Sequence, residues 1–279
     1  MKKKIIFLTL LIMALFICSP ILFLISGSFM DTKELTKNIG AVFSNGKGFA
    51  SWIVSPKYPT LRSYIEILLD TPEFFVVFWN SVKIVFFSIV GQLLVGVPAA
   101  WGFARYKFPY KKILFTIYII VMLMPFQVTM ISNYVVLDKL NILDTHLSII
   151  LPAIFSTFSV FIMYRFFKNI PESIIESARI DGASEKQIFF KIGIPLGMPG
   201  IMSSVILSFL EYWNLIEQPL IFLKSKNLWP LSLYLPNVKI ENAGVAFGTS
   251  AITLISAIIV FFAGQSYLEQ GIASTAVKE

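Results

Sequence analysis

The segment PESIIESARIDGASEKQIFFKIGIP, residues 171–195, is a polar stretch between two long apolar runs. Its Asp181-Gly182 pair predicts a sharp turn, because glycine adopts positive φ without steric cost. Ser184 and Gln187 have the spacing of a capping box, which predicts the start of a second helix after the turn. The segment therefore predicts a short, stiff knob of two helices with a glycine at the corner.

The composition around this knob is that of a membrane protein. The chain has 279 residues, of which 56% are hydrophobic and 14% charged, and its mean hydropathy is +0.77; soluble domains carry about 25% charged residues. The single cysteine, Cys18, excludes an intrachain disulfide, and the single histidine, His146, excludes a multi-histidine metal site. We therefore expect a protein in the lipid bilayer with no cofactor of its own.

The N-terminus allows two interpretations. Three lysines followed by an apolar run are typical of a signal peptide, and Cys18 raises a lipoprotein alternative. The uncharged run from Ile5 to Ser26 exceeds the roughly 7–15 residues of a signal core, and the residue before Cys18 is a bulky isoleucine. These features favour a retained transmembrane helix.

Uncharged runs of roughly 20 residues predict an all-α protein with six transmembrane helices. These are Ile5–Ser26, Phe74–Phe103, Ile113–Leu137, Leu147–Tyr164, Leu196–Leu223 and Ala243–Leu268. We expect Pro195 to break or kink the chain before the fifth run. The predicted divisions are residues 1–30 as the first helix, 31–73 as an extracytoplasmic segment, and 74–279 as the core domain that carries the knob.

The distribution of positive charge predicts the orientation in the membrane, because short cytoplasmic loops are enriched in lysine and arginine. The loop Ala104–Lys112 contains Arg105 and three lysines, whereas the loop Asp138–His146 contains one lysine. Both termini and the knob are therefore expected in the cytoplasm. The net charge of +7 is explained by this orientation, and we expect no nucleic acid partner.

Reporter fusions test this orientation. Fusions after Lys112 and Lys191 should report a cytoplasmic location, and fusions at Asn45 and Lys226 should report an external one. An external result after Lys191 would place the knob out of reach of any cytoplasmic partner.

The knob resembles the EAA signature of permease subunits of ABC importers, which reads Glu-Ala-Ala, three residues, Gly, nine residues, Ile-x-Leu-Pro. Here the corresponding residues are Glu176-Ser177-Ala178, Gly182 and Ile192-Gly193-Ile194-Pro195, with serine and isoleucine as the two departures. Further stretches resemble carbohydrate permeases of the maltose-transporter type over nearly the whole chain. They are Phe78-Trp79-Asn80-Ser81, Arg105-Tyr106-Lys107-Phe108, the run around Met124-Pro125, and the Trp213-Asn214 region.

This resemblance implies a type I ABC importer permease fold, in which the knob is a coupling helix that docks on an ATPase subunit. The coupling residues would be Glu176, Ser177, Ala178, Arg179, Asp181 and Gly182. The implied partners are a second, related permease, two ATPase subunits and an extracytoplasmic solute-binding protein. Without the matched spacing, an amphipathic helix lying on the membrane surface would be the alternative.

No nucleotide-binding loop accompanies the knob. The nearest candidate runs from Gly40 to Gly46-Lys47-Gly48, with five residues between the glycines instead of four and no Ser or Thr after the lysine. ATP and magnesium are therefore expected on separate ATPase subunits, and this chain is not expected to be an enzyme.

Polar side chains in the fifth run mark a candidate substrate pathway, because such groups are costly inside a membrane. They are Glu211, Trp213, Asn214, Glu217 and Gln218. Aromatic faces with hydrogen-bonding neighbours suit sugars; an aromatic and polar belt at the membrane surface is the alternative. Asn80, Gln92 and Gln127 are more often hydrogen-bonding groups between helices.

The sequence thus predicts a permease subunit in the cell membrane that imports a carbohydrate by alternating access. A secondary transporter or channel is the alternative, but it would need ion-coupling carboxylates in the membrane midplane, and the intramembrane acids lie towards one end of the fifth run. A membrane enzyme would need a catalytic cluster that the sequence does not show.

Overall fold

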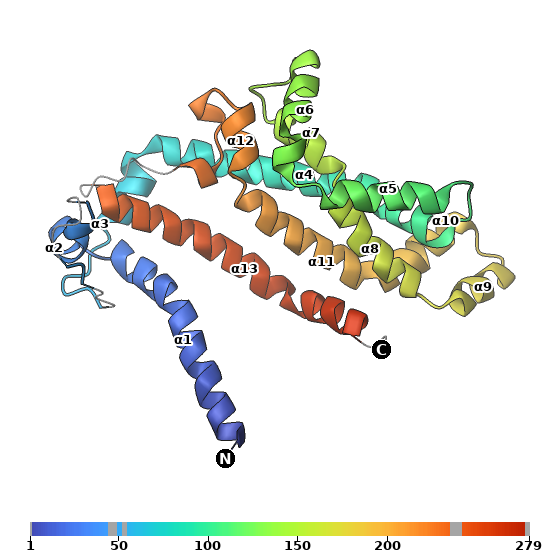
Figure 1. The fold of residues 1–279 in the computed structure, drawn as a ribbon, viewed down its shortest axis with the longest axis horizontal. Coiled ribbons are helices and arrows are strands. Elements are labelled where there is room, and N and C mark those ends of the chain that lie inside the picture. The colour runs from blue at the N-terminus through green and yellow to red at the C-terminus, as the bar shows by residue number, and fades with distance from the viewer. Residues whose placement is uncertain (1, 44–48, 52–54, 235–241, 277–279) are drawn as a thin grey trace. The chain divides into compact units, whose positions relative to one another are not determined.

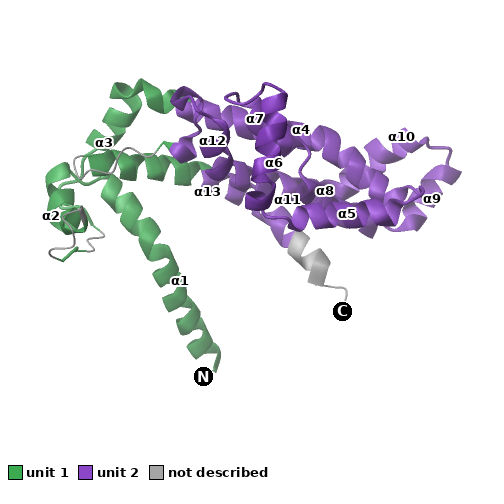
Figure 2. Ribbon diagram, turned by 45° about the horizontal axis from the view of Figure 1, so that its top comes forward, with its two compact units in different colours: residues 1–76, 234–256 green, residues 77–233, 257–279 purple. Residues whose placement is uncertain are grey.

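The structure is a computed structural model that describes residues 2–43, 49–51, 55–234 and 242–276, and the regular elements within these ranges are all helical (Figure 1). The fusion site Asn45 lies outside the described residues, as do parts of the 31–73 segment. The chain divides into two compact units, residues 1–76 with 234–256 and residues 77–233 with 257–279 (Figure 2).

Unit 1 contains α1 (Lys2–Ser28), α2 (Thr32–Phe43), α3 (Arg62–Ile65), a π-turn at Glu66–Asp70, and the first parts of α4 and α13. The large apolar side chains of α1 are mostly exposed, and its buried residues are confined to its last turn. A helix that is apolar all round is typical of a membrane span. The helices α2 and α3 are too short to cross a bilayer, which agrees with the predicted interruption after the first span.

Unit 2 contains the remaining helices. They are α4 (Pro72–Arg105), α5 (Lys111–Leu123), α6 (Phe126–Lys139), α7 (Leu147–Ile154), α8 (Thr157–Asn169), α9 (Glu172–Ile180), α10 (Glu185–Ile188), α11 (Ile194–Trp213), α12 (Glu217–Phe222) and the second part of α13 (Ala243–Ala276). Its largest core joins α4, α8, α9, α10 and α11 around Trp101 and Phe167. Glycines allow the close contact of α8 with α11, since a Cβ atom at Gly197 would lie 2.2 Å from the Phe167 ring.

Five helices of the described chain are long and apolar enough to cross a membrane, and a bent pair makes a sixth candidate. The five are Lys2–Ser28, Pro72–Arg105, Leu147–Asn169, Glu185–Trp213 and Ala243–Gln270. The bent pair is α5 and α6, which meet at 102° on either side of Pro125. The third predicted span is therefore broken, because proline lacks the N–H group that would continue the helix.

Two predicted boundaries around α11 are wrong. The predicted fifth span continued to Leu223, but α11 ends at Trp213, and the short α12 begins only at Glu217. The expected break at Pro195 is also absent, because a π-turn at Phe189–Gly193 joins α10 to α11 in one continuous helix. The wider π-turn shifts the hydrogen bonds to partners five residues apart, which makes room for a proline ring in the next turn.

Candidate functional site

The knob predicted from residues 171–195 is present, and its corner is a Schellman motif. Gly182 has φ of +80° and donates its N–H to the Arg179 carbonyl at 3.0 Å, while the Ala183 N–H reaches the Ala178 carbonyl at 2.9 Å. These two bonds satisfy carbonyls at the end of α9 that would otherwise lack partners. The left-handed conformation that the motif requires explains the glycine.

The second arm of the knob begins with the predicted capping box. The Ser184 hydroxyl accepts from the Gln187 backbone, and the Gln187 side chain accepts from the Ser184 backbone at 2.8 Å. From there the helix continues through the π-turn into α11, so that Glu185–Trp213 forms 29 residues of unbroken helix. The second arm of the knob is thus the end of a membrane helix.

One face of the knob is part of the core of unit 2. Ile175, Ala178 and Ile188 are buried against Trp101 and Phe167. Among the predicted coupling residues, Ala178 is therefore the one whose side chain is buried in the chain's own core. A small residue at this position brings α9 close to the helices beneath it.

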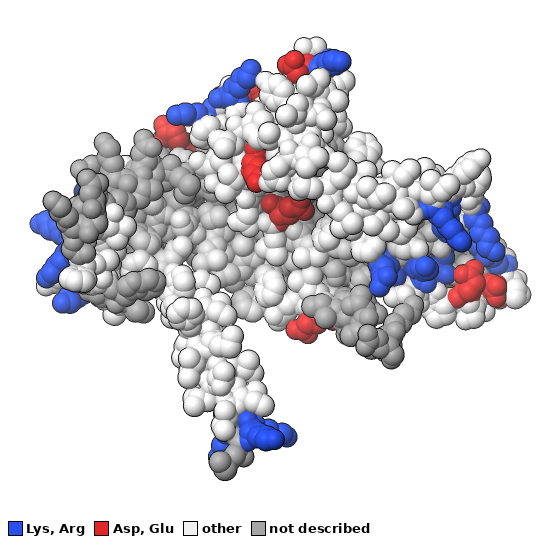
Figure 3. All heavy atoms as spheres, viewed as in Figure 1, with Lys and Arg blue, Asp and Glu red and all other residues white. Residues whose placement is uncertain are grey.

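The opposite face of the knob is exposed. Glu176, Ser177, Asp181 and Gly182 lie on it, and Ile180 is 86% exposed. Charged side chains gather at the end of unit 2 that carries α9 (Figure 3).

Arg179, predicted to act at the coupling surface, is engaged within the knob. Its Nε donates to Glu185 at 2.9 Å, and its guanidinium lies 3.8 Å from the Glu172 carboxylate. The hydrogen bond to Glu185 raises the pKa of the Arg179 guanidinium above its usual range. Arg179 therefore fixes the two arms of the knob relative to each other, while Glu176 forms no ion pair among the described residues.

Arg105, at the end of α4, holds the knob to the rest of unit 2. Its side chain is only 6% exposed and donates to Glu172 at 2.8 Å and to the Phe167 carbonyl at 2.6 Å. It also donates to the Ile170 carbonyl. Arg105 thus satisfies carbonyls at the end of α8 and binds the first residue of α9 at the same time.

In the sequence, Arg105 indicates only the orientation of the chain in the membrane. Its partners at the end of α8 and the start of α9 lie more than 60 positions away in the chain. The available signal was that Arg105 is the one arginine in a loop whose other cations are lysines.

The predicted pathway residues do not form one group. Trp213 is 3% exposed, stacks on Phe209 with ring centroids 5.3 Å apart, and meets the Phe78 ring edge-on. Asn214 is exposed, and its side chain donates to the Leu210 carbonyl. Trp213 therefore packs between helices, and Asn214 is the more accessible of the two.

The remaining pathway candidates lie near the end of α11 and on α12. Glu211 and Glu217 are exposed, and Glu217 accepts two hydrogen bonds from Gln127 at 2.8 and 2.9 Å. The Oε1 atom of Gln218 is buried without a partner among the described residues. Gln127 and Glu217 thus join α6 to α12, which is the interhelical role that the sequence predicted for Gln127.

Gln92 forms the centre of a buried polar network in unit 2. Its side chain donates to the Ala153 carbonyl and the Tyr212 hydroxyl, and accepts from Ser159 and Ser208 at 3.0 and 2.8 Å. The network joins α4, α7, α8 and α11, which confirms the prediction for Gln92. Such a satisfied network fixes how the helices pack.

Substitutions at Trp213 and Asn214 test the pathway interpretation. Asn214→Ala should lower solute uptake while leaving assembly with the ATPase intact. Trp213→Ala should lower uptake further, because it also removes a buried ring at a cost of about 3–5 kcal/mol. The measurement is an uptake assay in which all variants are present in the membrane at equal abundance. Trp213→Phe is the control for the loss of packing. Unchanged uptake in Asn214→Ala and Trp213→Ala would favour the membrane-surface belt.

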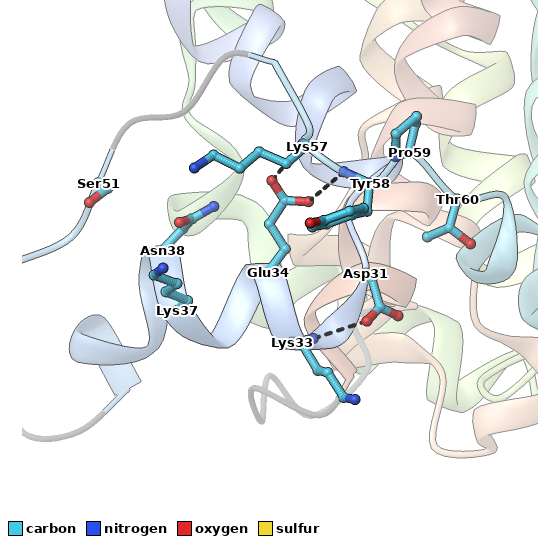
Figure 4. Close-up of a pocket in the computed structure, with 10 residues that line it drawn as sticks. All are labelled: Asp31, Lys33, Glu34, Lys37, Asn38, Ser51, Lys57, Tyr58, Pro59 and Thr60. Carbon is cyan, nitrogen blue, oxygen red and sulfur yellow. Dashed lines mark hydrogen bonds between the residues drawn. The ribbon is translucent and has the colours of Figure 1, made fainter.

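Unit 1 contains a cavity of about 620 Å³ between α2 on one side and Ser51 with residues 57–60 on the other (Figure 4). Lys33, Lys37 and Lys57 are among its lining residues. The Glu34 carboxylate accepts from the backbone N–H groups of Lys57 and Tyr58, so it holds the cavity's two walls together. None of the ten lining residues is a histidine or cysteine.

Comparisons with known proteins agree on one type of protein. The family described as "Binding-protein-dependent transport system inner membrane component" matches residues 92–274. The arabinooligosaccharides transport system permease protein AraQ of Halalkalibacterium halodurans is 29% identical over 262 residues, 93% of this chain and 90% of that protein. The lactose transport system permease protein LacG of Rhizobium radiobacter is 31% identical over 207 residues, 73% of this chain and 74% of that protein.

A solved structure has the same fold. It is a bacterial ABC transporter involved in the import of the acidic polysaccharide alginate, and a chain of it matches with a TM-score of 0.81 at 23% identity. The match covers 95% of both chains. It supports the all-α fold of this chain.

Proposed function

The chain belongs to the family of binding-protein-dependent transport system inner membrane components, and we propose that it is the permease subunit of an ATP-driven ABC importer for a carbohydrate. The observation that carries the proposal is the knob at residues 171–195, a rigid two-helix element whose inner face is buried and whose outer face is exposed. Such an element can transmit force, because its position is fixed relative to the membrane helices.

The names of the relatives favour a carbohydrate as the transported solute. Those names specify arabinooligosaccharides and lactose, and a further relative from Bacillus subtilis, 27% identical over 239 residues, is named for polygalacturonan and rhamnogalacturonan. The alginate importer has been solved in complex with its alginate-bound periplasmic protein, and a chain of that complex matches with a TM-score of 0.59. We therefore propose an oligosaccharide delivered by a solute-binding protein.

The proposed mechanism begins at the knob. Closure of two ATPase subunits would move the exposed face around Glu176 and Ile180. Because α10 continues into α11, this movement would tilt α11 directly. Arg105 would carry the same movement to α4 through its bonds to α8 and α9. A second permease subunit would complete the passage, and its opening would alternate between the two sides of the membrane.

Copurification tests the proposal. The tagged chain, extracted from its native membrane in mild detergent, should bring down an ABC ATPase and a second permease. The assembled complex should hydrolyse ATP faster when the ligand-loaded binding protein is added. A chain that purifies alone and transports its solute with an ion gradient would be a secondary transporter and would contradict the proposal.

A further inference from the structure

A groove on the surface of unit 2 lies between α4 and α7 and has a volume of about 490 Å³. Most of its lining is apolar, from Phe87, Val90, Leu94, Ile150 and Ile154 among others. Leu94 is 72% exposed and Phe87 53% exposed. An apolar groove of this size on a membrane helix is open to an apolar ligand.

The two polar residues of the lining, Lys83 and His146, occupy the same end of the groove. None of the ion pairs among the described residues involves Lys83. The His146 Nε2–H donates to the Leu228 carbonyl at 3.0 Å, and burial lowers the pKa of His146, so the imidazole is neutral at pH 7. Lys83 therefore carries the formal charge at this end, and α7 begins there with the positive end of its dipole.

The groove has the length of one leaflet of a bilayer. From Lys83 to Leu94 the helix advances 11 residues, or about 16 Å at 1.5 Å per residue. This is close to half of the roughly 30 Å hydrocarbon core. Trp79, one turn before Lys83 on α4, is 56% exposed, as expected for an aromatic side chain at the membrane surface. The cation thus lies at headgroup depth, with the apolar groove extending below it.

We propose that this groove binds an anionic phospholipid, with its phosphate at Lys83 and one acyl chain between α4 and α7. A lysine is a suitable ligand for a phosphate, because its ammonium group forms charge-assisted hydrogen bonds with phosphate oxygens. Gly91 allows α4 and α7 to pack closely at the floor of the groove, since a Cβ atom there would lie 2.3 Å from the Ile154 side chain. The lipid would stabilise the contact between α4 and α7, and the proposal does not depend on which solute is transported.

Lipid retention by the detergent-purified complex, measured by native mass spectrometry, tests the proposal. Lys83→Gln removes the cation and should lose the retained phosphatidylglycerol, whereas Lys83→Arg should keep it. Val90→Trp fills the groove with the cation in place and should also lose it. Lys139→Gln is the matched control, because Lys139 is an exposed lysine outside the groove and its loss should change nothing.

Two results would overturn the proposal. One is equal phosphatidylglycerol retention by Lys83→Gln and Lys139→Gln. The other is a photo-crosslinker at position 94 that labels a partner subunit and not lipid, which would show that a protein helix occupies the groove. The expected result is obtained after reconstitution in vesicles that contain phosphatidylcholine and phosphatidylglycerol. The photo-crosslinker at position 94 should label phosphatidylglycerol even when phosphatidylcholine is in at least tenfold excess.

Discussion

Gly182→Val should abolish solute uptake while leaving membrane insertion intact. Insertion depends on the apolar spans, and Gly182 lies outside them. Its φ of +80° strongly disfavours a β-branched side chain, with a strain on the order of 1–3 kcal/mol. The strain is relieved when the turn changes shape, which breaks the two hydrogen bonds of the Schellman motif and moves α9 relative to α10. A docking surface tolerates such movement poorly, because its contacts are lost together.

The cause of this effect can be separated from steric crowding. A Cβ atom at Gly182 would meet no heavy atom within 4 Å apart from those of its chain neighbours, so the strain within the chain lies in the backbone conformation. Gly182→Asn is the matched control, because asparagine tolerates positive φ. It should retain most of the uptake, and Gly182→Val should also lose affinity for the ATPase subunit.

Glu176→Lys provides the second comparison at the knob. It reverses a charge on the exposed face without touching the turn, so it should lower substrate-stimulated ATP hydrolysis while the fold of the knob persists. Measurements of uptake, ATPase binding and stimulated hydrolysis distinguish the two variants. Parental transport and normal ATPase binding by Gly182→Val in the membrane would show that the corner plays no part in coupling.

Arg105→Ala should lower uptake at least tenfold by releasing the knob from α4. The substitution leaves the Ile170 carbonyl without this donor, at a cost of about 1–3 kcal/mol for an unsatisfied buried group, and it leaves the Phe167 carbonyl with only the Ile170 N–H at 3.4 Å. Because 1.4 kcal/mol corresponds to a factor of ten, a loss in the middle of this range is enough to shift the knob's position measurably. The expected signature is ATP hydrolysis that no longer responds to the loaded binding protein.

Two further variants identify which bond of Arg105 matters. Arg105→Lys keeps the charge but cannot bind the carboxylate and two carbonyls together, so it should recover only part of the coupling. Glu172→Gln removes the ion pair with Arg105 and the longer one with Arg179 but leaves the carbonyl bonds of Arg105 in place. The Glu172 carboxylate is 57% exposed, so the variant should have a smaller effect. If Glu172→Gln is as damaging as Arg105→Ala, the carbonyl bonds are not the main link. Normal coupling in Arg105→Ala would mean that the buried apolar face holds the knob unaided.

Local signals predicted the knob well, and tertiary contacts explain where the prediction failed. The turn at Gly182 and the cap at Ser184 depend on residues within a few positions of each other, and both are present. The inward placement of Ala178 and the role of Arg105 depend on helices distant in the sequence, which periodicity does not reveal.

Proline was the least reliable signal. Pro125 breaks its span with a bend of 102°, and Pro195 lies within an unbroken helix. The difference is the π-turn before Pro195, which provides a hydrogen-bonding pattern that accommodates the ring. The burial of Trp213 could not be predicted from the sequence either. An aromatic residue at the end of an apolar run is equally typical of a substrate pathway, of the membrane surface and of a protein core.

The π-turn at Phe189–Gly193 also sets the rotational register between the exposed face of the knob and the faces of α11. Each residue of an α-helix turns the chain by about 100°. Deletion of one residue in this turn would leave the knob and α11 intact. It would nevertheless rotate the docking face of the knob by more than a quarter of a circle relative to the faces of α11. Coupling therefore depends on the number of residues between the knob and α11 as much as on which residues form the docking face.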